Sequence, residues 1–383
     1  MSNEIKSPIS SSENSSLISP IYRYSDLEIQ AKKYLSHHVF TYINSGSGNE
    51  ETLTSNEQAF KKWKILPEFL NDVSTRDLSV SLLGDTFKMP FLLAPVGHLG
   101  AAHPDGELAV ARAAKKRQVP YVVSTVSSYS LEEIAGELGD SPKWFQLYWS
   151  TDEELTVSFV QRAEKAGYSA LVITIDSPVL GFREADLTNQ FFPVREGFGS
   201  GNYFKDPIFR SRLEESPEQN RAAAIEELLK ITFQPKLSWD DLAFIKKHTN
   251  LPIILKGVLH PNDAKKAMEY GVEGLIVSNH GGRQLDGVIS SLDALPGVVK
   301  EVNGQIPVLL DSGIRRGPDV IKAIALGADA VLLGRPYVYG LGINGEEGVA
   351  EVLDHFLTDI DISLATAGKR TISDLDPSLL VRE

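Results

Sequence analysis

Short apolar runs alternate with amphipathic stretches along most of this chain. The apolar runs lie at residues 91–96, 121–125, 144–148, 170–175, 253–256, 274–277, 307–310 and 330–333. Between them the apolar residues take helical spacing, as at residues 106–117, 153–165, 262–270 and 318–326. Near-continuous apolar strands that alternate with helices are typical of a parallel sheet covered by helices, and eight repeats favour closure into a (β/α)8 TIM barrel. A doubly wound open sheet is the alternative architecture.

The segments outside this alternation predict additions to a single domain of residues 21–383. Residues 1–20 are rich in serine with few apolar groups, so we expect a disordered tail there. Residues 24–64 have helical spacing, with Ser25 and Asp26 as cap candidates and a break at residues 45–48. We therefore expect an N-terminal helical segment (21–88), the barrel (89–345) and a C-terminal helical segment (346–383).

One long interval, residues 189–237, follows the fourth predicted strand without a clear period. It exceeds the ordinary length of a loop in a compact domain. We expect a mobile lid over a site here, rather than a second domain.

Composition excludes several classes of function. The chain has no cysteine, which rules out disulfides, thiolate metal sites and thiol catalysis. A formal net charge of -13 argues against a nucleic-acid partner, because phosphate binding needs a basic surface. No apolar run approaches the roughly 20 residues that cross a bilayer, and the N-terminus lacks a secretory layout. We expect a cytoplasmic protein without membrane association and without a metal ion.

Polar side chains lie where the predicted strands end. In a barrel the carboxyl ends of all strands meet at one mouth, where active sites are built. Gln146 and Tyr148 are two residues apart and share one face of their strand, as do Thr174 and Asp176. The polar strand-end residues together are Ser124, Gln146, Tyr148, Thr174, Asp176, Lys256, Ser278, His280 and Asp311. Their convergence predicts a site at this mouth.

The loop SNHGGRQLDG, residues 278–287, places His280 and Arg283 directly after the sixth predicted strand. A histidine base three residues from a fixed cation suits the deprotonation of an anionic substrate whose carboxylate is held in place. The alternative is a glycine-rich turn with a solvated arginine and a histidine bonded to backbone.

Glycines and arginines follow the last two strands. DSGIRRG (311–317) comes after the seventh strand and GRP (334–336) after the eighth, so Arg315 and Arg335 lie where barrels commonly hold a phosphate. A glycine turn with two surface arginines is the alternative. No GxGxxG motif opens a helix after an early strand, which disfavours a dinucleotide fold.

With these motifs, the chain from about residue 22 onward resembles the FMN-dependent 2-hydroxy-acid oxidising family, which includes lactate oxidase, lactate 2-monooxygenase and glycolate oxidase. The resemblance implies FMN as cofactor, a small L-2-hydroxy acid as substrate with L-lactate the first choice, and O2 as the acceptor that yields H2O2. It also implies a homo-oligomer, either a tetramer or an octamer.

The resemblance implies roles for individual residues. His280, Asp176 and Tyr148 match the catalytic positions, with His280 as base and Asp176 as its carboxylate partner. Tyr42 in YINSG, Arg183 and Arg283 match the residues that bind the substrate, together with Tyr148 and His280. Lys256 matches the lysine beside flavin N1 and O2. The other implied FMN contacts are Ala94, Pro95, Val96, Gly97, Ser124, Gln146, Thr174, Ser278, Asp311, Ser312, Gly313, Arg315, Gly334 and Arg335.

Within that family, the resemblance puts Gly97 beside flavin N5, where many oxidases have alanine. A missing methyl group there predicts extra space at the reactive edge of the flavin, which leaves an oxidase, a monooxygenase that releases acetate and CO2, and a dehydrogenase with another acceptor all open. Val126 and Leu180 are the expected apolar walls for the substrate's substituent.

Other interpretations of the sequence are weaker. An inosine monophosphate dehydrogenase type of barrel needs a cysteine, and a phosphosugar isomerase barrel leaves SNHGGRQ unexplained. A barrel that only binds a phosphorylated ligand, without catalysis, is the alternative from a different class. The remaining histidines considered as metal ligands, which are His37, His38, His98 and His103, lack partners at metal spacing, so we expect core or surface positions for them.

Overall fold

The computed structural model describes residues 21–383, so the expected tail at residues 1–20 lies outside the described part of the chain. Eight parallel strands form a closed barrel in the order β10-β11-β4-β5-β6-β7-β8-β9. The strands are β4 (Phe91–Leu93), β5 (Tyr121–Ser124), β6 (Lys143–Leu147), β7 (Leu171–Thr174), β8 (Ile253–Val258), β9 (Gly274–Val277), β10 (Val308–Leu310) and β11 (Ala330–Leu333). The predicted TIM barrel is confirmed, and all eight strands lie at the predicted places.

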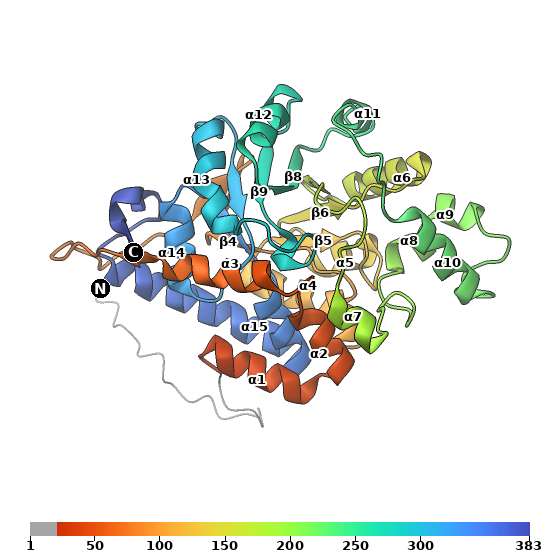
Figure 1. Cartoon of the computed structure of the whole chain (residues 1–383), viewed down its shortest axis with the longest axis horizontal. Helices are drawn as coiled ribbons and strands as arrows, with labels where there is room; N and C mark the ends of the chain where they lie inside the picture. Colours follow the sequence, from red (N-terminus) through yellow and green to blue (C-terminus); the bar gives the residue numbers. More distant parts are fainter. Residues whose placement is uncertain (1–20) are drawn as a thin grey trace.

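Helices surround this barrel (Figure 1). They are α4 (Gly106–Arg117), α5 (Leu131–Leu138), α6 (Glu153–Lys165), α11 (Asp241–Ile245), α12 (Pro261–Glu269), α13 (Ser291–Val302), α14 (Gly317–Ala325) and α15 (Arg335–Thr366). Helix α5 begins with a capping box between Ser130 and Glu133, and the Asp152 side chain caps α6. These caps satisfy amide groups that the first turn of a helix leaves free.

The strands are buried on both faces, which explains their continuous apolar runs. One set of side chains fills the barrel interior, and these are Leu92, Ala94, Val122, Trp144, Ala170, Val172, Ile254, Ile276, Leu309, Ala330 and Leu332. The alternate residues, such as Val123 and Phe145, pack beneath the helices. The hairpin of β2 (Val80–Leu82) and β3 (Asp85–Phe87) adds Leu82 and Phe87 to the interior cluster, with the Phe87 ring 6.2 Å from Trp144. The interior is therefore a packed core, and a site has room only at its mouth.

The N-terminal segment is less helical than expected. It contains α1 (Tyr24–Tyr34), α2 (His37–Asn44) and α3 (Glu51–Lys61), but also the β2–β3 hairpin and β1 (Trp63–Ile65). Strand β1 pairs with β12 (Leu380–Arg382) at the other end of the chain, a contact that no local pattern reveals. The C-terminal segment, expected to be helical, therefore ends in a strand. Helix α15 kinks at Asn344 and Gly345, which is where we expected the barrel to end.

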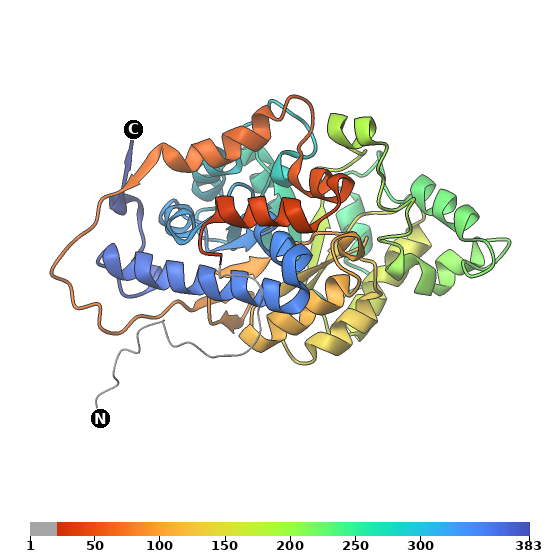
Figure 2. The same ribbon diagram turned by 90° about the horizontal axis from the view of Figure 1, so that it is seen from below.

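The interval 189–237 is a set of short helices rather than an irregular loop. After α7 (Glu184–Asn189) come α8 (Gly201–Lys205), α9 (Pro207–Ser211) and α10 (Arg221–Ile231), which extend to one side of the barrel in Figure 2. Asp206 and Asn220 cap α9 and α10, and Tyr203, Phe209 and Leu228 are buried. These few apolar residues, separated by polar ones, were too sparse to show a period. In residues 21–383, no helix is both long and apolar enough to cross a membrane.

Candidate active site

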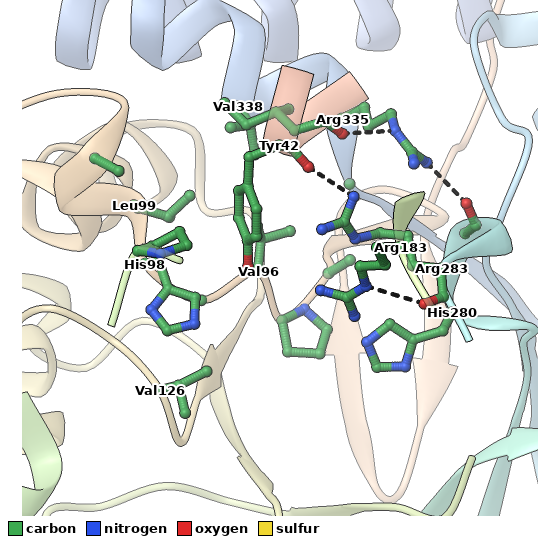
Figure 3. A pocket seen from close by; sticks show the side chains of 18 of the residues that line it. Tyr42, Val96, His98, Leu99, Val126, Arg183, His280, Arg283, Arg335 and Val338 are labelled. Carbon is green, nitrogen blue, oxygen red and sulfur yellow. Dashed lines mark hydrogen bonds between the residues drawn. The ribbon is translucent and has the colours of Figure 1, made fainter. Parts of the chain in front are cut away.

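A cavity of about 520 Å³ opens at the carboxyl ends of the barrel strands. Figure 3 shows His280, Arg283, Arg183, Tyr42 and His98 around it, from four separate parts of the chain. The predicted site residues that line it are Tyr42, Ala94, Pro95, Val96, Gly97, Tyr148, Arg183, Lys256, His280, Arg283, Asp311, Ser312, Gly313, Arg315, Gly334 and Arg335. The other predicted residues are not part of this lining: Ser124, Gln146, Thr174 and Ser278 are buried, and Asp176 is half-buried.

His280 and Asp176 form a largely buried dyad at the cavity, with side chains 17% and 12% exposed. His280 follows β9 and Asp176 follows β7, and His280 Nδ1 lies 2.7 Å from Asp176 Oδ1. Because a carboxylate only accepts, Nδ1 carries the proton and Nε2 keeps its lone pair. Ser177 Oγ donates to the same carboxylate oxygen over 2.9 Å, and the Tyr148 hydroxyl lies 3.3 Å from Nε2. His280 also has a left-handed backbone (φ 60), a strained conformation of the kind found at functional sites.

Burial and neighbouring charges set the protonation of this dyad. Burial lowers the pKa of His280 below its ordinary value, although Asp176 opposes that effect. Burial by itself would raise the pKa of Asp176, but His280 and Lys256 outweigh it, and the pKa lies below its ordinary value. Burial also raises the pKa of Tyr148. At neutral pH the dyad therefore pairs a neutral imidazole with a carboxylate, beside a phenol that keeps its proton.

Arg183, Arg283 and Tyr42 line the same cavity, and both arginines lie next to His280 in Figure 3. Arg283 Nη1 donates to the backbone oxygens of Tyr42 (2.6 Å) and Ser45 (2.7 Å), and the guanidinium lies 4.8 Å from the centre of the Tyr42 ring. Arg183 Nε donates to Arg283 O over 3.0 Å. These bonds tie α2 to the loop after β9. Within residues 21–383, Arg283 Nη2 and Arg183 Nη1 have no hydrogen bond, so two guanidinium N–H groups are left to face the cavity.

A buried lysine, Lys256 in β8, lines the cavity. Lys256 Nζ lies 3.1 Å from Asp311 Oδ2 and donates to Ser278 Oγ over 2.9 Å. Burial opposes its charge, but Asp311 and Asp176 outweigh burial and raise the pKa of Lys256. Behind it, Gln146 Nε2 donates to Thr174 Oγ1 over 2.9 Å and Gln146 Oε1 accepts from Ser124 Oγ over 3.2 Å. This part of the site thus contains one fixed cation and an amide held by hydrogen bonds at both its oxygen and its nitrogen.

The far end of the cavity, which is lined by Arg315, Arg335 and Gly313, has the features of an anion site. Arg335 starts α15, and its guanidinium donates to the backbone oxygens of Ile43, Gly281 and Ser45. Arg315 pairs with Glu57 at 2.9 Å. Gly313 has φ +86, and a side chain there would lie 2.4 Å from Asn56 O. Glycine backbone, two arginines and a helix N-terminus together are typical of phosphate binding.

Known proteins resemble this chain over nearly its whole length. The model of the FMN-dependent dehydrogenase family matches residues 31–382. The chain belongs to that family. It is 49% identical to an L-lactate oxidase of Lysinibacillus sphaericus, over 94% of this chain and 92% of the relative. It is 38% identical to 2-hydroxyacid oxidase 1 of Homo sapiens, over 93% and 95%. A solved structure of mandelate oxidase superposes with a TM-score of 0.84 at 36% identity and covers 95% of this chain and 98% of its own.

FMN is the cofactor of this family member, and the cavity fits it in chemistry. Arg315, Arg335 and the Gly313 backbone supply donors for a phosphate, and Lys256 supplies a cation for the polar edge of an isoalloxazine. Around Gly334 an added Cβ would meet only Ala94 Cβ, at 4.0 Å, so the floor there is open to a ligand. We expect the phosphate at the Arg315 and Arg335 end and the ring system above Lys256.

The expected extra space at Gly97 is not found. A methyl group at Gly97 would lie 2.4 Å from Val126 Cγ2 and 2.9 Å from Val126 O. Val126 therefore occupies the volume that an alanine side chain would take. The prediction of a larger opening beside the flavin is wrong, because it considered one position without the neighbour that packs on it.

Sequence reasoning missed two residues of this cavity. His98 was expected to be a core or surface histidine, but its ring lines the cavity, with Nδ1 3.1 Å from Phe198 O, and burial lowers its pKa to about 4. Asp186, in α7, also lines the cavity. The available signals were the positions of His98 next to Gly97 and of Asp186 one helical turn after Arg183. Both ends of the lid interval contribute to the lining as well, through Phe192, Pro193, Val194, Arg195, Leu228, Leu229, Thr232 and Phe233.

Proposed function

We propose that this protein oxidises small L-2-hydroxy acids, with L-lactate the first choice, to 2-keto acids, and that O2 reoxidises the flavin to give H2O2. One observation carries the proposal. His280 and the two arginines Arg183 and Arg283 line one cavity, where His280 Nε2 has a lone pair and Arg183 Nη1 and Arg283 Nη2 are the guanidinium nitrogens without a hydrogen bond in residues 21–383. A hydroxyl and a carboxylate on adjacent carbons match a base and a pair of cations that line the same cavity. The names of the relatives from Lysinibacillus and Nostoc, both L-lactate oxidases, support the same substrate.

Each residue of the site has a separate role in the proposed reaction. Arg183, Arg283 and Tyr42 hold and orient the carboxylate. His280 Nε2 accepts the proton of the C2 hydroxyl, and Asp176 stabilises the imidazolium that forms. Tyr148 lies within hydrogen-bond distance of the same nitrogen and orients the hydroxyl. Bound FMN supplies the two-electron acceptor, and the Lys256 ammonium favours negative charge on that side of the cavity.

The walls around the substituent favour a small aliphatic group. Val126, Leu180 and Phe233 line this part of the cavity, and a methyl group suits them. Val126 also takes the space beside Gly97 in which a keto-acid product would linger next to the flavin. This contact favours release of the keto acid, and hence an oxidase, over the monooxygenase that would decarboxylate it.

Aerobic turnover of L-lactate tests the proposed function. We expect the purified yellow protein to be bleached by L-lactate without air, and to produce pyruvate with stoichiometric H2O2 in air. Acetate and CO2 without free peroxide would make the protein a monooxygenase, and a reduced flavin that air fails to reoxidise would make it a dehydrogenase. Activity confined to mandelate or long-chain acids would overturn the choice of lactate. If no 2-hydroxy acid bleaches the flavin, the remaining interpretation is a barrel that binds a phosphorylated ligand without catalysis.

The dyad predicts a definite pH dependence. His280 works as a base only when neutral, and burial lowers its pKa, so kcat/KM should stay high at pH 6.5 and fall only as the pH drops through the lowered pKa. Asp176→Asn removes the charge that opposes the effect of burial. The acid limb of the profile should then move to still lower pH while the plateau falls. An acid limb above pH 6.5, or an upward shift in the variant, would contradict the assignment of His280.

Assembly and location remain predictions. The homo-oligomer implied by the family, a tetramer or octamer, is supported by exposed apolar side chains on two adjoining segments, namely Val179, Leu180, Phe182, Leu187, Leu285 and Ile289. Gln284 joins these segments by donating to Asp176 O and Val179 O. We keep the cytoplasm as the expected location.

A further inference from the structure

A buried carboxylate stands beside the two arginines of the substrate wall. Asp186 lies in α7, is 6% exposed and lines the cavity. Its Oδ2 lies 3.9 Å from Arg283 Nη2 and 4.0 Å from Arg183 Nη1, the two nitrogens that have no hydrogen bond. In the part of the chain that the structure describes, no group donates a hydrogen bond to its side chain. A carboxylate that lines a cavity and accepts no hydrogen bond from the protein is available to act on a ligand there.

Most other charged residues of the lining have an ion-pair partner of their own or lie at the far end of the cavity. Lys256 pairs with Asp311, and His280 is neutral beside Asp176. Arg315 pairs with Glu57 and, like Arg335, belongs to the far end. Arg195, the lid arginine, is half exposed and pairs with Glu226. At the substrate end, Arg183 and Arg283 share one carboxylate of the lining, that of Asp186. The Asp176 carboxylate is hydrogen-bonded to His280 and is not part of the lining.

Among the groups that line this end of the cavity, two arginines and one aspartate leave one positive charge for the ligand. Burial raises the pKa of Asp186, and both guanidinium groups oppose that rise and favour the carboxylate. His98, which lines the same cavity, has its pKa lowered to about 4 by burial and adds no charge at neutral pH. Two arginines and one aspartate thus match a ligand with a single carboxylate.

We propose that Asp186 is a specificity-determining residue that limits the site to 2-hydroxy acids with one carboxylate. A second carboxylate, on the substituent, would enter a cavity lined by apolar side chains and by the anionic Asp186. The positive charge of the two arginines is already balanced there by Asp186 and the first carboxylate. Two like charges roughly 6 Å apart at an effective dielectric constant near 20 repel by an amount equivalent to about 100-fold in affinity. This inference rests on the proposed function, since it takes the site to bind a 2-hydroxy acid.

Succinate and succinamate separate charge from size. They have nearly the same shape, differ by one negative charge at pH 7.5 and have no hydroxyl group to oxidise. Titration of the FMN holoenzyme with each, followed by the change in flavin absorbance, gives two dissociation constants. We expect the native protein to bind succinamate at least about tenfold more tightly than succinate. Asp186→Asn should reduce that ratio by at least about fivefold, and should raise the turnover of L-malate relative to L-lactate.

Glu184→Gln is the matched control. Glu184 lies on the same helix and loses the same charge, but its side chain is exposed and does not line the cavity. The succinamate preference should be unchanged in this variant. Asp186→Ser serves as a second variant if Asp186→Asn loses FMN, because its smaller side chain also removes the charge.

The outcomes are distinct. Equal binding of the two ligands by the native protein, or an unchanged ratio in both Asp186 variants, overturns the proposal. A fall of the ratio in Glu184→Gln as large as in Asp186→Asn also overturns it, because the effect would then come from general charge. If L-lactate fails to bleach the flavin while the titrations follow the expected pattern, the proposed function is wrong and the role of Asp186 in anion selection stands.

Discussion

Replacing His280 with alanine is expected to slow anaerobic reduction of the bound flavin by L-lactate at least about 100-fold, while the protein stays yellow. Asp176 accepts from His280 Nδ1 over 2.7 Å, which leaves the lone pair on Nε2 as the base in the cavity. None of the predicted phosphate contacts depends on this side chain, so FMN should stay bound. Stopped-flow absorbance of the flavin measures the rate directly.

The matched control for this variant is His37→Ala, because His37 is exposed at the start of α2 and does not line the cavity. It should reduce its flavin at the rate of the native protein. Added imidazole should restore part of the rate in His280→Ala if only the base is missing. Flavin reduction in His280→Ala at nearly the native rate would show that another group takes the proton.

The second large effect is expected for Arg283→Lys, which should lower kcat/KM for L-lactate by about 100-fold. Arg283 Nη1 already bonds to Tyr42 O and Ser45 O, and Nη2 is left for the substrate. A lysine has one ammonium in place of the planar fork, so it cannot hold both backbone oxygens and a carboxylate. Burial lowers the pKa of Arg283 to about 10, which leaves it charged at neutral pH.

Lactamide distinguishes the carboxylate contact from a general disturbance of the site. It lacks the negative charge, so the native protein should oxidise it far more slowly than L-lactate, and Arg283→Lys should affect it much less. Arg210→Lys, at an exposed arginine that pairs with Glu218, is the control for the substitution itself. Equal losses for lactate and lactamide in Arg283→Lys would show that the variant acts by displacing residues 42–45.

The fold was predictable because its signals are local. A strand in a barrel covered by helices is buried on both faces and reads as an apolar run, as in β7, where all four residues are buried. The β2–β3 hairpin and the pairing of β1 with β12 were not predictable in the same way, because each strand has three residues and too few apolar positions to show a period.

For the site, the sequence by itself determined which residue types end each strand and which loops contain glycines and arginines. Only the tertiary structure decided that residues 104 positions apart, Asp176 and His280, meet at 2.7 Å and so assign the tautomer of the base. It also decided that Val126 fills the space beside Gly97, and that Asp186 shares a wall with Arg183 and Arg283. The physical reason is the same in each case: composition and period act within one segment, whereas occupied volume and net charge in a cavity depend on every segment that packs around it.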